Sequence, residues 1–297
     1  MLKAADKPLL LVLLVFQLLW YISDGWLSKV LLNIAGYDVN FWESIKIAVL
    51  GVVGSQFVPL AGGSMATYYL FRRLDVPAPA IFFLMITWSI LIGINYVLFF
   101  LVSLILLPAT IYKFIPPQIF IVLSLLLAAI ILLLIHNGRL FIILWKSIGS
   151  LINKLSKKTL VDINWVEVFV GKLFASAHLL IKNKLGLAKA ATGAFLFFAI
   201  NLTTLYLSFL VFGFKPHVFT LIFGFMTSMF LALITLAPET PGVMEASLTA
   251  VFVSLGFPTH ITVFSLLLFR TVSFWLPLAF GIWSFLKLRK ENIIKLD

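Results

Sequence analysis

The feature that most constrains the fold of this chain is a series of long segments without a single Asp, Glu, Lys or Arg. Most exceed the roughly 18 to 20 residues that an α-helix needs to cross a bilayer about 30 Å thick. In lipid, a helix pairs its backbone groups within one segment. The sequence therefore predicts an all-α fold, a polytopic membrane helix bundle. The segments are residues 8–23, 76–112, 114–138, 190–214, 216–238 and 246–269.

Composition agrees with this class and excludes several others. The 297 residues are 62% hydrophobic, with a mean hydropathy of +1.14. The absence of cysteine excludes disulfides, thiolate metal sites and cysteine nucleophiles. The formal net charge of +11 comes mainly from Lys3 and Lys7, from residues 139–189 and from the tail at 287–295. Basic clusters between apolar spans are a topology signal that also attracts anionic lipids, so we expect no nucleic-acid partner.

The positions of the basic residues predict a multi-pass protein of the cell membrane. We expect the N-terminus, the central basic linker and the C-terminal tail to lie in the cytoplasm. A polar segment with Asp24 and Lys29 would lie outside. We expect about seven or eight spans, with one or two Pro/Gly-broken re-entrant segments. If the tail is cytoplasmic, either residues 241–256 cross the membrane fully, which we favour, or part of 164–181 does.

The chain reads as one transmembrane domain with two related halves. The first half covers residues 1–135, an amphipathic basic linker covers 136–186, and the second half covers 187–297. In each half a Pro/Gly-broken segment precedes a short apolar stretch, a second proline and a long span. Paired interruptions of this kind are typical of transporters built from repeats with discontinuous helices. The pattern favours a two-fold internal repeat, and the alternative is that the proline spacings match by chance.

The segment around Pro241 and Gly242 is the main candidate for a binding site. Two carboxylates, Glu239 and Glu245, flank this break, Thr240 lies within it, and Arg270 follows in the next apolar run. Charged side chains at bilayer depth are costly and normally mark a transport or binding path. A helix that restarts after Gly242 directs N–H groups toward an anion, and arginine suits a phosphate oxygen. The alternative is a structural ion pair of Arg270 with Glu245 or Glu239. Both interpretations hold if the pair opens when a headgroup competes for the arginine.

Other candidate residues lie in the first half. Pro59, Gly62 and Gly63 predict a second helix end of the same kind. Arg72 and Arg73 are either determinants of topology at the interface or ligands for a headgroup. The four histidines show no spacing that suits a metal, and there is neither a phosphate-cradling glycine loop nor a serine nucleophile motif. We expect no metal and no cofactor.

The second-half motifs resemble a known family. They are residues 237–246, Leu-Gly-Phe-Pro at 255–258, Phe269-Arg270, Trp-Leu-Pro at 275–277 and Gly281. This set resembles the transmembrane region of the lysylphosphatidylglycerol synthase/flippase family, and residues 59–63 with 68–70 match its first-half signature. The chain departs from the family where Pro241-Gly242 runs directly into Val243, without a second glycine pair. The resemblance implies an integral membrane protein that moves lipids between leaflets, here without the soluble aminoacyl-transfer domain of the full synthase.

We therefore expect a flippase for an anionic phospholipid or a polyprenyl-phosphate-linked lipid. Its partners would be membrane lipids, and translocation rather than covalent catalysis would be its activity. Without a nucleotide-binding motif, movement would be downhill or coupled to an ion gradient. Two alternatives stay open: a membrane-embedded lipid-linked glycosyl or headgroup transferase, and an accessory subunit that positions a separately encoded transferase.

Overall fold

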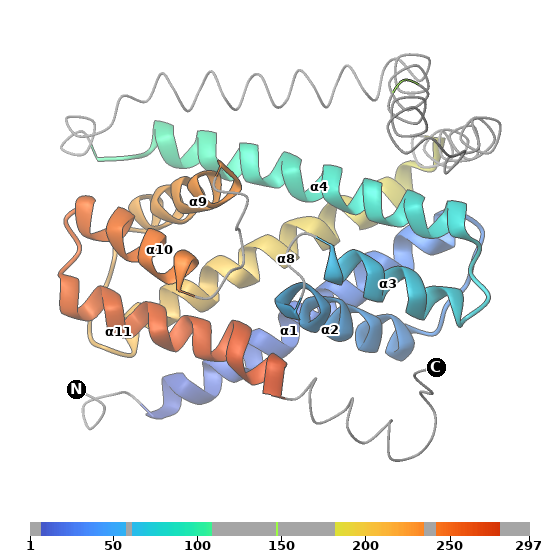
Figure 1. Ribbon diagram of the computed structural model, residues 1–297. Coiled ribbons are helices and arrows are strands. Elements are labelled where there is room, and N and C mark those ends of the chain that lie inside the picture. Colours follow the sequence, from blue (N-terminus) through green and yellow to red (C-terminus); the bar gives the residue numbers. More distant parts are fainter. Residues whose placement is uncertain (1–6, 58–60, 109–146, 148–181, 235–241, 280–297) are drawn as a thin grey trace.

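The computed structural model describes residues 7–57, 61–108, 147, 182–234 and 242–279 (Figure 1). The ordered elements in these ranges are helices, which confirms the predicted all-α class. Those long and apolar enough to cross a membrane cover Pro8–Ile34, Ala78–Ile105, Lys184–Leu210 and Thr259–Ala279. The elements are α1 Lys7–Ile34, α2 Phe41–Phe57, α3 Gly62–Arg72, α4 Ala78–Ile105, α8 Lys184–Leu210, α9 Val218–Ile234, α10 Val243–Ser254, α11 Thr259–Arg270 and the π-helix η2 Thr271–Trp275.

The order of helices repeats between the two halves. Each half has a long helix, a helix of 17 residues, a short helix and a second long helix, which in the second half is α11 with its continuation through η2 to Ala279. The first helices have 28 and 27 residues, and the short ones have 11 and 12. Residues 58–60 and 235–241, which contain Pro59 and the predicted site residues Glu239, Thr240 and Pro241, lie between the middle helices of each half and outside the described residues.

The ends of the long first helices also repeat. After α1, Gly36 has a φ of 89°, and after α8, Gly213 has a φ of 74°. In both turns the next N–H bonds back to a helix carbonyl, at 2.9 Å from Tyr37 and 3.2 Å from Phe214. This is a helix stop that uses a left-handed residue, which glycine adopts without steric cost.

The second proline of each half has the same structural role in both halves of the repeat. Pro77 precedes α4 and Pro258 precedes α11, each with an extended backbone at the N-cap position. Proline removes a donor that the start of a helix does not need. The residue two positions earlier, Asp75 or Gly256, has a positive φ that ends the short helix. The matched spacing of prolines therefore reflects two equivalent turns.

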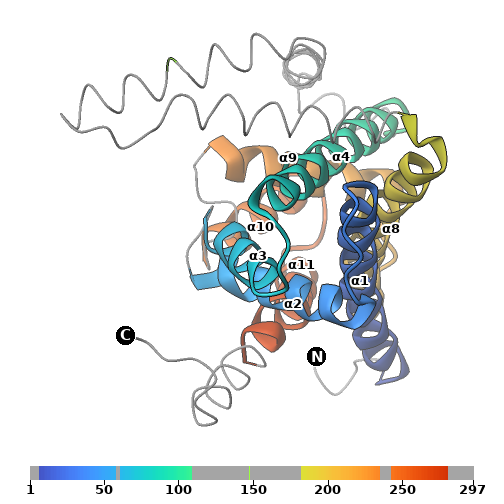
Figure 2. The ribbon, with the colours of Figure 1, turned by 90° about the vertical axis from the view of Figure 1, so that its right-hand side faces the viewer.

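The two halves run in opposite directions because α1 and α8 pack antiparallel. Early in the contact, the ring of Trp20 lies 4.6 Å from that of Phe197. At the end of α1, Ile34 lies next to Gly186, near the start of α8, so that a Cβ at Gly186 would be 2.9 Å from Ile34 Cδ1. Figure 2 shows the two helices side by side. The structure therefore has an inverted-topology repeat, the arrangement found in many transporters.

This packing corrects the predicted topology. Since α1 and α8 are both long enough to span the membrane and run antiparallel, their first residues lie on opposite sides of it. The prediction that the N-terminus and the central linker are both cytoplasmic is therefore wrong for one of them. Helix α1 also continues through Asp24 and Lys29 to Ile34, so these two residues lie within the helix and not in a polar segment outside the membrane.

The predicted crossing by residues 241–256 is also wrong. Helix α10 has 12 residues and is therefore about 18 Å long, too short for a bilayer about 30 Å thick. It packs against α9 as a re-entrant hairpin, as α3 packs against α2. The two hairpins start from opposite ends of the molecule and reach into its interior (Figure 1).

Glycines allow the close approach of the helices in the first hairpin. A Cβ at Gly54 would lie 2.6 Å from the carbonyl oxygen of Gly62, and a Cβ at Gly63 would lie 2.9 Å from that of Gly51. Small residues at such contacts are typical of membrane helix pairs, because lipid offers little hydrophobic drive for association. The Gly62-Gly63 pair thus starts α3 as predicted, and it also fixes the packing of α3 on α2.

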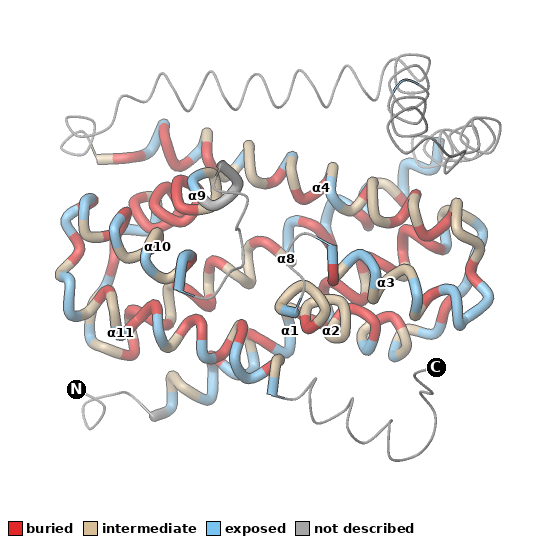
Figure 3. Tube along the Cα trace, in the orientation of Figure 1, coloured by how far each residue is buried: buried red, intermediate tan, exposed pale blue. Residues whose placement is uncertain are grey.

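Each half has its own apolar core. One core includes Leu31, Phe71 and Phe83, and the other includes Phe209 and Phe252. Helix α4 of the first half adds its last residues to the second core, and α8 of the second half adds its first residues to the first core. Figure 3 shows the buried residues on the sides of the helices that face one another. The long helices therefore join the halves into one body.

The inverted arrangement predicts the accessibility of single cysteines, which the cysteine-free chain makes simple to read. We expect cysteines at Lys7 and Lys184 to react oppositely with a membrane-impermeant thiol reagent in intact cells, because α1 and α8 start on opposite sides. A cysteine at the exposed Lys215, beyond the end of α8, should react like the one at Lys7. Equal labelling at positions 7 and 184 would contradict the inverted repeat.

Candidate functional site

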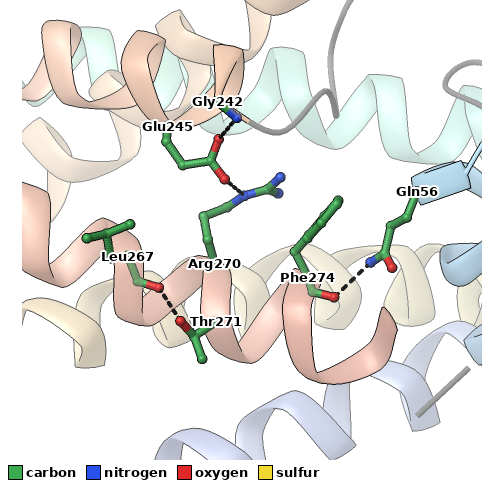
Figure 4. Close-up of polar contacts among 7 residues, drawn as sticks. All are labelled: Gln56, Gly242, Glu245, Leu267, Arg270, Thr271 and Phe274. Carbon is green, nitrogen blue, oxygen red and sulfur yellow. Dashed lines mark hydrogen bonds and ion pairs between the residues drawn. The ribbon is translucent and has the colours of Figure 1, made fainter. Parts of the chain in front are cut away.

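The candidate site lies where the first turn of α10, the end of α11 and the tip of the first hairpin meet (Figure 4). Glu245 comes from α10, Arg270 is the last residue of α11, and Phe274 follows it in η2. Gln56 comes from the end of α2 in the other half. Both halves of the repeat therefore contribute to one small region.

Arg270 and Glu245 form an ion pair. The Nε of Arg270 donates to Glu245 Oε1 at 2.8 Å, and the two side chains are only 9% and 18% exposed. The structure thus forms the ion pair that the sequence suggested, and it forms it with Glu245. The buried guanidinium would be costly in this setting without a carboxylate beside it.

The start of α10 holds Glu245 in place. The N–H of Gly242 donates to Glu245 Oε2 at 2.6 Å, so the carboxylate closes the first turn of its own helix. Gly242 has a φ of 85°, a conformation that favours glycine. A carboxylate at this position also interacts favourably with the positive end of the helix dipole. One oxygen of Glu245 therefore orients the helix start, and the other orients Arg270.

The guanidinium keeps a donor that the described residues do not use. Arg270 Nη2 is buried and has no hydrogen-bond partner among them. The guanidinium carbon lies 4.4 Å from the centre of the Phe274 ring, a cation–π contact that fixes its plane. A buried donor without a partner costs free energy, which a ligand with acceptor oxygens would recover. Arginine donors match phosphate oxygens in geometry and charge.

A π-helical turn connects the ion pair to the first half. Directly after Arg270, η2 covers Thr271–Trp275, and the N–H of Leu276 bonds to the Thr271 carbonyl. Short π-helical segments inside α-helices occur frequently at functional sites. The carbonyl of Phe274 accepts a hydrogen bond from Gln56 Nε2 at 3.2 Å, while the buried Gln56 Oε1 has no partner within the described ranges.

Gln56 and Phe274 were missed in the sequence. Gln56 is a polar residue at the end of an apolar helix and just before a break, and that position was a usable signal. Phe274 follows Arg270 by four residues, the spacing of side-chain neighbours on a helix. Both signals become specific only once the hairpin tip is known to contact η2.

The structure does not bring Arg72 and Arg73 to this site. They lie at the C-terminal end of α3, where both are exposed and contact nearby residues. Arg72 Nη1 donates to the Val76 carbonyl, and the guanidinium of Arg73 lies 4.7 Å from the Tyr69 ring centre. Pro59, Glu239, Thr240 and Pro241 lie outside the described residues. Within the described ranges, no cluster of three His, Asp or Glu side chains could hold a metal ion.

A largely apolar hollow of about 450 Å³ opens beside the ion pair, between α10 and α11. Glu245 stands at its polar edge. The rest of its lining is small or aliphatic: Ala246, Thr249, Ala250, Val253, Val263 and Leu267. The hollow is therefore an apolar groove with one charged residue, Glu245, at its edge.

These features define a class, the integral membrane proteins with inverted repeats and re-entrant helices, here with one buried ion pair in the interior. Comparison with protein families gives the particular group. Residues 1–281 match the family described as the lysylphosphatidylglycerol synthase TM region, and the chain belongs to that family. The match spans both halves, as the resemblance predicted. A search of curated proteins finds no match.

The geometry of the ion pair predicts which of its two alanine variants is less stable. Glu245→Ala should destabilise the protein more than Arg270→Ala, because it leaves a buried cation without a counterion, at a cost of about 3 to 5 kcal/mol. In Arg270→Ala, Glu245 keeps the Gly242 N–H and the end of the α10 dipole. Thermal melting in detergent measures both, with Lys46→Ala as the control, an exposed lysine bonded to Glu43. The reverse order would mean that Arg270 is solvated without Glu245.

Proposed function

We propose that this protein translocates an anionic phospholipid, or a polyprenyl-phosphate-linked lipid, between membrane leaflets. The observation that carries the proposal is the buried Arg270 guanidinium, placed where both halves of an inverted repeat meet, with a donor that has no partner among the described residues. Intramembrane charges typically mark substrate paths. Membership of a family named for a lipid-modifying synthase supports a lipid as the substrate.

The headgroup phosphate would be held by Arg270 and by the start of α10. One phosphate oxygen accepts from Arg270 Nη2, and the helix start adds its positive end near Gly242. Glu245 then competes with the phosphate for the guanidinium. This competition weakens the binding of the headgroup and so favours its release.

The acyl chains need not enter the polar site. The apolar hollow between α10 and α11 begins at Glu245, so a chain can lie there while the headgroup sits at Arg270. Inverted repeats exchange which side is open by rocking one half against the other around a fixed site. The two hairpins that reach in from opposite ends suit this exchange.

The distribution of basic residues indicates which end of the molecule faces which side of the membrane. The end where α1 and α3 finish and α8 begins carries Lys29, Arg72, Arg73, Lys184 and Lys189 (Figure 1). The opposite end carries Lys7 and Lys215 among the described residues. Positive charge favours the cytoplasm. We therefore assign the start of α8 to the cytoplasmic side and the start of α1 to the outer side.

Transfer of labelled lipid between the leaflets of liposomes tests the proposal. The purified protein should accelerate transfer of an anionic lipid more than that of a neutral one. Arg270→Gln should slow it by roughly ten- to a hundredfold, the effect of losing one charged hydrogen bond. Arg270→Lys keeps the charge but not the planar fork, and should lose less.

Lys46→Gln is the matched control, since it removes an exposed cation that also bonds to a glutamate. It should transfer lipid like the wild-type protein. Melting curves confirm that each variant is folded. If the wild-type protein transfers no anionic or polyprenyl-phosphate lipid but forms product from an added sugar or headgroup donor, the protein is a transferase and the proposal is wrong.

A further inference from the structure

A second intramembrane charge lies away from the Arg270 site. Asp24 is in the middle of α1, inside the candidate span Pro8–Ile34, and is 9% exposed. It lies about one turn from Trp20, which contacts Phe197 in the antiparallel α1–α8 pair. The one hydrogen bond of its side chain comes from Trp88 of α4, whose Nε1 donates to Asp24 Oδ1 at 2.7 Å.

No cation balances this carboxylate among the described residues. The ion pairs there join Lys29 to Asp38, Lys46 to Glu43 and Arg270 to Glu245. The helices packed on α1 are α2, α4, α8 and η2. Their titratable and charged side chains are Glu43, Lys46, Tyr96, Lys184, Lys189 and Tyr206, and none bonds to Asp24. On α1 itself, the buried Tyr21 lies one turn before Asp24, and Lys29, five residues after it, pairs with Asp38.

Asp24 belongs to a polar stripe along α1. Gln17, Tyr21, Asp24 and Ser28 recur at intervals of four, three and four residues, which places them on one face of the helix. All four are buried, with exposures of 7 to 9%. An apolar side chain would pack at such positions without cost. A buried ionisable residue inside a membrane span, as Asp24 is in this stripe, typically marks a substrate path, an ion path or a proton relay.

The chemistry of the position favours a proton over a metal cation. An ionised carboxylate accepts at about four lone-pair sites, and here the indole N–H fills one. A cation such as Ca²⁺ needs six or more oxygen ligands, and Asp24 belongs to no group of three His, Asp or Glu side chains in the described residues that could hold a metal ion. Protonation removes the charge with no further ligand, which suits a low-dielectric site.

The repeat shows that this charge belongs to one half. Asp24 is the eighteenth residue of α1, and the eighteenth residue of α8 is Asn201. The same fold therefore accepts an uncharged amide at the equivalent place. The first half carries a titratable group where the second carries none, and the second half carries the Arg270–Glu245 pair.

We propose that Asp24 is the proton-binding site that couples lipid movement to a proton gradient, an inference that rests on the proposed function. The carboxylate accepts a proton from solution on one side, which forms an O–H bond, and returns that proton to solution on the other side. No other bond changes. The charged form favours conformations that hydrate the α1–α4–α8 contact, and the neutral form permits the packed one.

Liposomes with a proton gradient test the coupling. With a gradient of about one pH unit, one-for-one coupling should give up to about a tenfold ratio of labelled lipid between leaflets for the wild-type protein. Asp24→Asn should bring that ratio to about one, while exchange without a gradient persists. Asp38→Asn, which removes an exposed carboxylate, is the control and should keep the wild-type ratio.

Infrared spectroscopy tests proton binding without any transport. Titration of the purified protein should show the carbonyl band of a buried protonated carboxyl that is missing in Asp24→Asn and present in Asp38→Asn. A gradient response that survives in Asp24→Asn, or an unchanged band, overturns the inference. If the wild-type protein shows the band but transfers no lipid, Asp24 binds a proton and the proposed function is what fails.

Discussion

The antiparallel packing of α1 on α8 is the constraint on which the rest of this structure depends. It fixes the second half in the opposite direction to the first, so the two re-entrant hairpins enter from opposite ends. Backbone groups at the broken ends of such hairpins cannot face lipid, since nothing there satisfies them. The long helices must therefore shield the hairpins, and α4 and α8 do so by packing into the cores of both halves.

The shielded interior explains where the charges lie. Symmetry of the fold does not extend to the side chains, because Arg270 and Glu245 occur in the second half and Asp24 in the first. Among the described residues, the neighbours of Arg270 and of Asp24 leave part of the hydrogen-bonding capacity of each unused. A membrane protein can keep such groups only where a ligand, a proton or water completes them. This asymmetry underlies the two proposals, a headgroup site at Arg270 and a proton site at Asp24.

Much of this could be predicted from the sequence. The charge-free runs predict the helical class, and the prolines at 77 and 258 predict the repeat, because both signals are local. An ion pair of Arg270 with Glu245 or Glu239 was one of two interpretations that the sequence left open, because charges in apolar segments have few available partners. The direction of the second half, and with it the placement of the starts of α1 and α8 at opposite ends of the molecule, could not be foreseen, because it depends on contacts between residues as distant as Ile34 and Gly186.

Hairpin length was misjudged for a related reason. The sequence around α10 is apolar enough to cross a membrane, and only the turn at Gly256 shows that the helix ends after 12 residues. Gln56 was missed because its role depends on the tip of one hairpin touching a helix of the other half. Contacts between the two halves cannot be predicted from patterns within a short stretch of sequence.

The most direct test of the central claim is native mass spectrometry of the protein released from mild detergent. If Arg270 holds a lipid phosphate, the wild-type protein retains an anionic or polyprenyl-phosphate lipid. Arg270→Gln then loses this lipid, and Lys46→Gln keeps it. Equal retention of the same lipid by all three proteins, or retention of neutral lipids alone, would contradict a headgroup site at Arg270.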